Sequence, residues 1–189
     1  MSTAADYLSE ETLVDGSKVT IRAMRPDDKE RLIEAFLKLE PHTVRSRFFG
    51  FKRDLSEDDL KWLDKMDHVS DVGLVATLRG GGGEVIIGEG RYIARGQTAE
   101  IAFTVDEDWQ GRGIAARLLR HLTRIARQRA VVEFEADVLK DNAPMLAVFR
   151  HSGLPMTTQD GDEEVRVTLL LCSEPGPIGS RRTTVQQQH

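Results

Sequence analysis

The stretch from Thr104 to Leu119, TVDEDWQGRGIAARLL, constrains the fold more than any other part of the chain. An apolar run ends at Val105, an acidic turn follows, and two glycines on either side of Arg112 lead into an amphipathic pattern. A strand that feeds a glycine-rich turn opening a helix presents a row of backbone N–H groups to an anion. The stretch therefore predicts an anion-binding turn. Together with the apolar run over 131–139, it predicts a parallel strand pair joined by a helical crossover.

The bulk properties predict one soluble globular domain. The chain has 189 residues, 40% of them apolar and 30% charged, which suffices for a full core. A net charge of −5 argues against a general nucleic-acid binder. The sequence contains neither an apolar run of about 18 residues nor a secretory signal pattern, so we expect a cytoplasmic protein without a membrane span. The single cysteine, Cys172, excludes an internal disulfide framework, and no histidines have metal-ligand spacing, so no metal is expected.

The periodicity of apolar residues predicts the order of the elements. The glycine run from Gly80 to Gly83 reads as a hairpin connection, because neither Gly-Lys-Ser/Thr nor a helix follows it. The pattern predicts an α+β fold with a mixed, mostly antiparallel sheet of about seven strands and about four helices. We expect a flexible acidic leader over 1–16, the domain over 17–172 and a disordered tail over 173–189. Expected strands cover 18–23, 71–78, 84–94, 99–105, 131–139, 154–158 and 164–171, and expected helices begin near residues 26, 56, 113 and 142.

Arginines are dense in the helix that follows the turn. Arg112 and Arg117 lie near its N-terminus, where a positive charge opposes the helix dipole, and a docked polyanion would explain them. Arg120, Arg124 and Arg127 fit either an extended anion site or a solvated basic face, and the sequence leaves both open.

A dinucleotide fingerprint is the competing interpretation of the turn. Residues 111–116 fit G-x-G-x-x-A, and Asp137 follows 24 residues after Gly113. In that fingerprint, however, the first glycine follows the strand almost directly, whereas residues 106–110 intervene here. The remaining chain is also too short for the βα units of a doubly wound sheet, so this interpretation is disfavoured.

The stretch Gln110-Gly111-Arg112-Gly113-Ile114-Ala115 resembles the Q/R-x-x-G-x-G/A signature of the GNAT N-acetyltransferases. The preceding strand, the helix beginning at Asn142 and the Gly153-Leu154 pair fall where that superfamily has them, so the resemblance covers 18–171. Within the superfamily, RSRFFG over 45–50 and NAPML over 142–146 resemble the bacterial protein lysine acetyltransferases of the Pat type.

The resemblance implies a site for acetyl-CoA. The pantetheine arm would pair like an added strand with Phe103, Thr104 and Val105. Asn142 would contact the arm, although a helix N-cap explains it equally well. The pyrophosphate would lie on the backbone of the turn, over Gln110, Gly111, Arg112, Gly113, Ile114, Ala115 and Ala116.

The resemblance also assigns the chemistry. A lysine amine of pKa about 10.4 must lose a proton before it attacks, and Glu100 is the candidate base, with Glu89 as the second candidate. A simple carboxylate at a strand start is the alternative explanation of Glu100. A backbone N–H near Thr104 would stabilise the oxyanion. Many GNATs have a tyrosine acid where this chain has Phe149, so the thiolate would leave as the anion or take its proton from water, and Phe149 would pack against the CoA arm.

The sequence thus predicts an acetyl-CoA-dependent N-acetyltransferase that acts by direct attack in a ternary complex. The expected acceptor is a protein lysine, for example on a metabolic enzyme, and the protein would be a monomer or a homodimer. Two alternatives stay open: a small-molecule amine acetyltransferase, and a CoA-binding sensor that retains the fold without turnover.

Overall fold

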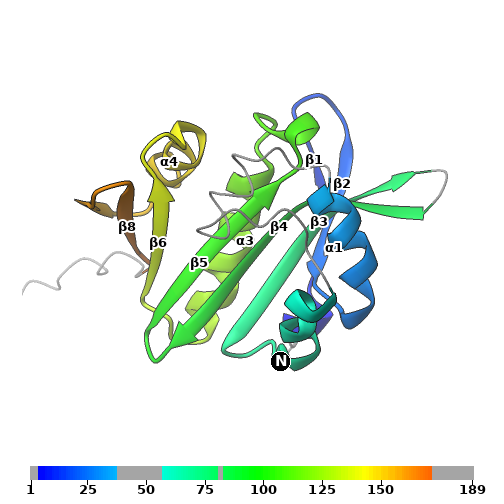
Figure 1. Ribbon diagram of the computed structural model, residues 1–189, viewed down its shortest axis with the longest axis horizontal. Coiled ribbons are helices and arrows are strands. Elements are labelled where there is room, and N and C mark those ends of the chain that lie inside the picture. The colour runs from blue at the N-terminus through cyan, green and yellow to red at the C-terminus, as the bar shows by residue number, and fades with distance from the viewer. Residues whose placement is uncertain (1–3, 38–56, 81–82, 172–189) are drawn as a thin grey trace, which may run out of the picture.

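The computed structural model describes residues 4–37, 57–80 and 83–171 (Figure 1). The segment 45–50, Cys172 and the expected tail over 173–189 lie outside the described residues. The strands are β1 (Leu8–Thr12), β2 (Lys18–Ala23), β3 (Asp71–Gly80), β4 (Gly83–Arg95), β5 (Thr98–Val105), β6 (Glu133–Leu139), β7 (Met156–Asp160) and β8 (Glu164–Leu170). The α-helices are α1 (Lys29–Leu37), α3 (Ile114–Gln128) and α4 (Ala143–Arg150), and the 3-10 helices are η1 (Ala4–Asp6), η2 (Pro26–Asp28), η3 (Glu57–Lys65) and η4 (Glu107–Trp109).

The strands form one mixed sheet in the order β1-β2-β3-β4-β5-β6-β8-β7. Among the strands that the structure describes, only β5 and β6 run parallel, and the other neighbouring pairs are antiparallel. The expected mixed, mostly antiparallel sheet is therefore confirmed, and the described part of the chain contributes eight strands to it in place of about seven. This topology is not the doubly wound parallel sheet that a dinucleotide fingerprint requires.

The additional strand comes from the segment that the sequence predicts to be a flexible leader. Residues 8–12 pair along their whole length with β2, from Leu8 opposite Arg22 to Thr12 opposite Lys18. The expectation misses this strand because LSEET carries little apolar signal, and its one large apolar side chain, Leu8, is 62% exposed. An edge strand held by backbone pairing needs no apolar face of its own.

Helix α3 covers one face of the sheet, and its apolar side forms part of the main hydrophobic core. Its apolar side packs on β3, β4 and β5, and small residues of β4 allow the close approach. A Cβ at Gly88 would lie 2.8 Å from Ile114 Cγ2, and one at Gly90 would lie 3.1 Å from Leu122 Cδ1. Helix α1 and η3 cover part of the opposite face through a second cluster that includes Leu32, Leu60 and Val75. Within the described ranges, no helix combines the length and apolar character needed to cross a bilayer.

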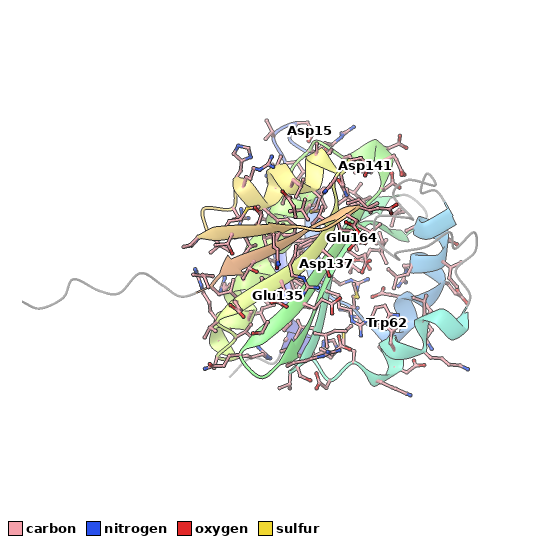
Figure 2. The ribbon with its side chains drawn as sticks, turned by 60° about the vertical axis from the view of Figure 1, so that its left-hand side comes forward. Asp15, Trp62, Glu135, Asp137, Asp141 and Glu164 are labelled. Atoms are coloured by element: carbon pink, nitrogen blue, oxygen red, sulfur yellow. The ribbon has the colours of Figure 1, made fainter. Side chains whose placement is uncertain are left out.

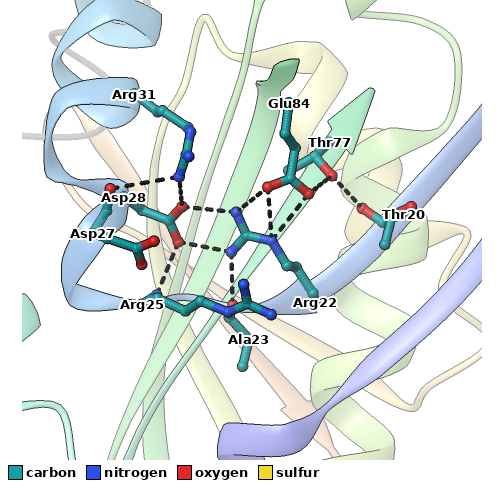
Figure 3. Close-up of polar contacts among 9 residues, drawn as sticks. All are labelled: Thr20, Arg22, Ala23, Arg25, Asp27, Asp28, Arg31, Thr77 and Glu84. Carbon is teal, nitrogen blue, oxygen red and sulfur yellow. Dashed lines mark hydrogen bonds and ion pairs between the residues drawn. The ribbon is translucent and has the colours of Figure 1, made fainter. Parts of the chain in front are cut away.

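A buried ion network ties β2 and η2 to the start of β4 (Figure 3). The Arg22 side chain is 3% exposed and donates to both carboxylate oxygens of Asp28 at 2.7 Å and to Glu84 at 2.6 Å. Bonding to Arg22 outweighs partial burial and lowers the pKa of Glu84 to about 2. A buried charge is stable only when its partner is in place, so the network holds η2, and with it the start of α1, in a fixed position relative to β2.

Candidate functional site

Strands β5 and β6 pair only at their beginnings and then part. Their register comprises Thr98 with Glu133, Ala99 with Phe134 and Glu100 with Glu135. Beyond these pairs β5 continues to Val105 along β4, while β6 continues to Leu139 along β8, and the two ribbons diverge (Figure 1). The backbone of residues 103–105 is therefore paired on its β4 side, and its other edge can accept an extended group as a strand would.

The turn after β5 has the geometry of an anion site. Asp106 caps η4, and the Gln110 side-chain amide donates to the Val105 carbonyl at 3.3 Å. Gly111 and Gly113 have φ of +71° and +79°, in the left-handed region that favours glycine. Gly113 is the N-cap of α3 and has no side chain with which to cap it. The N–H groups at the beginning of an α-helix lack intrahelical partners, so the start of α3 offers the donors that an anion needs.

The two arginines expected at the anion site have different surroundings. The Arg112 side chain is 45% exposed, stacks 4.6 Å over the Trp109 ring and donates to Asp15 at 2.8 Å. Arg117 is turned inward: it donates to the carbonyls of Arg112 and Gly113 at 3.4 and 3.2 Å, and to Glu11 at 3.1 Å. Arg117 therefore supports the backbone of the turn, and these contacts account for its position without a polyanion.

The remaining polar groups of α3 also contact other segments of the chain. Arg120 donates to Glu11 at 2.5 Å, and Arg127 donates to the Leu171 carbonyl at 2.5 Å. The buried His121 lies between Glu11, 2.8 Å from Nε2, and the hydroxyl of Tyr7 at Nδ1. These partners assign the proton of a neutral ring to Nε2. Arg120, whose side chain is 62% exposed, and Arg127 make these bonds while remaining on the solvent-exposed side of α3, and Arg124 is exposed there too.

Carboxylates line the face of the sheet opposite α3. Along β5 the buried side chains of Ile101, Phe103 and Val105 face the core, and Glu100 is exposed on the other side. Thr104 lies four residues further along β5 on the same side as Glu100, and its hydroxyl donates a hydrogen bond to Glu89 at 3.1 Å. The two candidate bases thus differ: Glu100 stands where β5 and β6 part, whereas Glu89 is held by Thr104.

The flanks of this face carry residues that the sequence interpretation did not select. Glu135 is directly paired with Glu100, and Arg166 forms bonds of 2.7–2.8 Å with Asp137 (Figure 2). On the other flank Arg91 is bonded to Asp71 and lies 3.7 Å from the centre of the Trp62 ring. The alternation in EFEAD, residues 133–137, is the signal that could have placed Glu135 and Asp137 on one face.

Asn142 and Phe149, on the segment that includes α4, have clear structural roles. Asn142 is the N-cap of α4, and its side-chain oxygen accepts from Met145 N at 3.1 Å. Phe149 is 1% exposed, and its ring lies 6.1 Å from that of Phe103. Phe149 thus packs against the core side of β5, beside the backbone edge of residues 103–105.

Residues 35–154 match the family model described as Acetyltransferase (GNAT) family. The match includes β5, the glycine turn, α3 and α4. The chain belongs to the GNAT family.

Comparisons with individual proteins agree with this family assignment. It is 36% identical over 121 residues to acetyltransferase PA5475 of Pseudomonas aeruginosa, covering 62% of this chain and 64% of that protein. It is 31% identical over 143 residues to acetyltransferase Pat of Mycolicibacterium smegmatis, covering 74% of this chain and 42% of that protein. The chain therefore spans less than two thirds of the length of either curated relative. Among solved structures, the GNAT domain of S. lividans PAT superposes with a TM-score of 0.76 at 32% identity, covering 86% of this chain and 96% of that one.

Proposed function

We propose that the protein transfers an acetyl group from acetyl-CoA to an amine, with the side chain of a protein lysine as the acceptor. The observation that carries this proposal is the parting of β5 from β6 beyond Glu100, on the strand that leads into the glycine turn. Among the described residues, β5 beyond Glu100 offers an unpaired backbone edge toward β6, and α3 offers its N-terminus, so an extended arm ending in phosphates fits both at once.

Different segments of the chain bind different parts of acetyl-CoA. The backbone of Phe103, Thr104 and Val105 is the pairing edge for the pantetheine arm. The turn from Gln110 to Ala116 receives the pyrophosphate, with the positive φ of its glycines orienting the N–H groups. Bound acetyl-CoA supplies the acetyl group as a thioester, and an N–H near Thr104 stabilises the oxyanion that develops on it.

Glu100 is the proposed base. It lies on the face opposite α3, and about 3.3 Å of rise per residue puts its Cα about 10 Å along β5 from that of Phe103. That separation favours proton transfer through an intervening water over direct contact with an amine beside residues 103–105. Glu89 is the less suitable candidate, because it already accepts the Thr104 hydroxyl.

A protein lysine is the proposed acceptor for two reasons. The exposed carboxylate of Glu100 suits the approach of a cationic side chain, whereas the neighbouring Glu135 and Asp137 are already paired with Arg166. The segments 45–50 and 142–146 resemble bacterial protein lysine acetyltransferases, and the similarity to proteins named Pat agrees with this.

The test is thiol release from acetyl-CoA with lysine peptides and, separately, with small amines. Glu100→Gln should lower kcat about 10²–10⁴-fold while leaving acetyl-CoA binding intact. Glu135→Gln removes the same charge at the directly paired position on β6 and serves as the matched control, with kcat within about fivefold of the wild type.

The outcomes separate the candidate functions. Equal loss of turnover in both variants, or in neither, would remove Glu100 from its role. Turnover with small amines but not with peptides would make the protein a small-molecule acetyltransferase. Binding of acetyl-CoA without thiol release to any amine would make it a CoA sensor.

A further inference from the structure

The hairpin formed by β1 and β2 contacts the glycine turn that precedes α3. Two of its carboxylates, Glu11 and Asp15, contact α3 and the turn, which lie about a hundred residues further along the sequence. In Figure 2, Asp15 lies at the same end of the molecule as Asp141, just before α4. The hairpin is therefore a neighbour of the site proposed for acetyl-CoA.

Glu11 is the anchor of this contact. Its side chain is 17% exposed and lies within 3.1 Å of Arg117, Arg120 and His121. Burial raises the pKa of the Glu11 carboxyl, but the bonds from Arg120 and His121 outweigh burial and leave the pKa below its usual value. The carboxylate is thus ionised at neutral pH, and several charge-assisted bonds hold the hairpin beside α3.

Asp15 makes a different kind of contact. Its side chain is 40% exposed, its ion-pair partner is Arg112, and that arginine is also largely exposed. The backbone N–H of Ser17 donates to Asp15 at 2.9 Å, which orients the carboxylate and lowers its pKa. Exposed ion pairs of this kind are weak and are readily exchanged for a better partner.

We propose that Asp15 competes with the phosphates of acetyl-CoA for Arg112, and so sets the affinity for the cosubstrate. This inference rests on the proposed function. A phosphate carries more charge than a carboxylate and takes the guanidinium in preference, so Asp15 subtracts from the binding energy without preventing binding. Because Glu11 holds the hairpin independently, exchange at Asp15 does not release β1.

The test is calorimetric titration with acetyl-CoA at low ionic strength. Asp15→Asn should bind about two- to fivefold more tightly than the wild type, the range expected from an exposed pair. Asp160→Asn, which removes an exposed carboxylate from β7 at the opposite edge of the sheet, should bind like the wild type. In an Arg112→Ala background, which itself binds more weakly, Asp15→Asn should have no further effect.

Three results would overturn the proposal. Equal affinities for Asp15→Asn and Asp160→Asn would show that Asp15 does not compete. Equal tightening by Asp15→Asn with and without Arg112 would show a general effect of net charge. Weaker binding by Asp15→Asn would make Asp15 a support for Arg112. If the wild type itself bound no acetyl-CoA, the proposed function would fall first, and this inference with it.

Discussion

Gly111→Ala and Gly113→Ala form a matched pair that tests whether Arg117 supports the anion turn. Both glycines have φ between +70° and +80°, so an added Cβ strains the backbone about equally. At Gly111 the new Cβ meets nothing within 4 Å, whereas at Gly113 it lies 2.7 Å from Arg117 Nη1. The two variants therefore differ mainly in whether Arg117 keeps its place.

The expected magnitudes follow from that difference. A non-glycine residue in the left-handed region costs about 1–2 kcal/mol, and the stiffer unfolded chain offsets part of it, so Gly111→Ala should lose about 1 kcal/mol. The Arg117 guanidinium is the end of a flexible side chain and can move aside. Its hydrogen bonds to the turn carbonyls and to Glu11 would then weaken, which adds about 1–2 kcal/mol for Gly113→Ala.

The assay is urea unfolding without ligand, followed by circular dichroism. An Arg117→Met background provides the control, because both glycine variants should there lose the same free energy. Costs for Gly111→Ala and Gly113→Ala within about 0.5 kcal/mol of each other in the wild-type background would refute the role assigned to Arg117.

Two further predictions concern buried charges. Arg22→Met should destabilise the fold by about 3 kcal/mol in urea unfolding, at the low end of the range for breaking a buried pair, because Asp28 keeps bonds to Arg31 and to the backbone of Arg25; a loss below about 1 kcal/mol would contradict this. Burial lowers the pKa of His121 despite the opposing effect of Glu11, so the unfolded chain binds the proton first and stability should fall as the pH drops below about 6.5. The free energy of unfolding measured at pH 7.5 and 5.5 should therefore decrease more for the wild type than for His121→Gln, and equal decreases would disprove the assignment.

Much of the fold was predictable because local patterns and tertiary packing agree. The alternation along β5 and the amphipathic pattern of α3 each predict an element and its buried side, and the structure confirms both. Strand β1 was not predictable in this way. Its apolar content is low, and it is held by pairing to β2 and by contacts of Glu11 with residues more than a hundred positions away.

Some features of the candidate site were likewise predictable from local sequence, and others depend on tertiary contacts. The glycine turn and the exposed side of Glu100 follow from spacing and period, which sequence contains. The partners of Arg112 and Arg117 depend on which carboxylates the fold brings near them, and a single sequence carries no signal for Asp15 or Glu11. Glu135 is intermediate: its face was predictable, but its position beside Glu100 required the register of β5 with β6.

The short pairing of β5 with β6 also has a mechanical consequence. In backbone pairing between strands, three residue pairs join β1 to β5 (the larger panel) to β6, β8 and β7 (the smaller panel), whereas the strands within each panel pair over longer stretches. We expect the smaller panel to open as a separate cooperative unit in hydrogen exchange. A ligand that bonds to both panels would stabilise the junction between them, so its binding energy would add to the free energy needed to open the smaller panel.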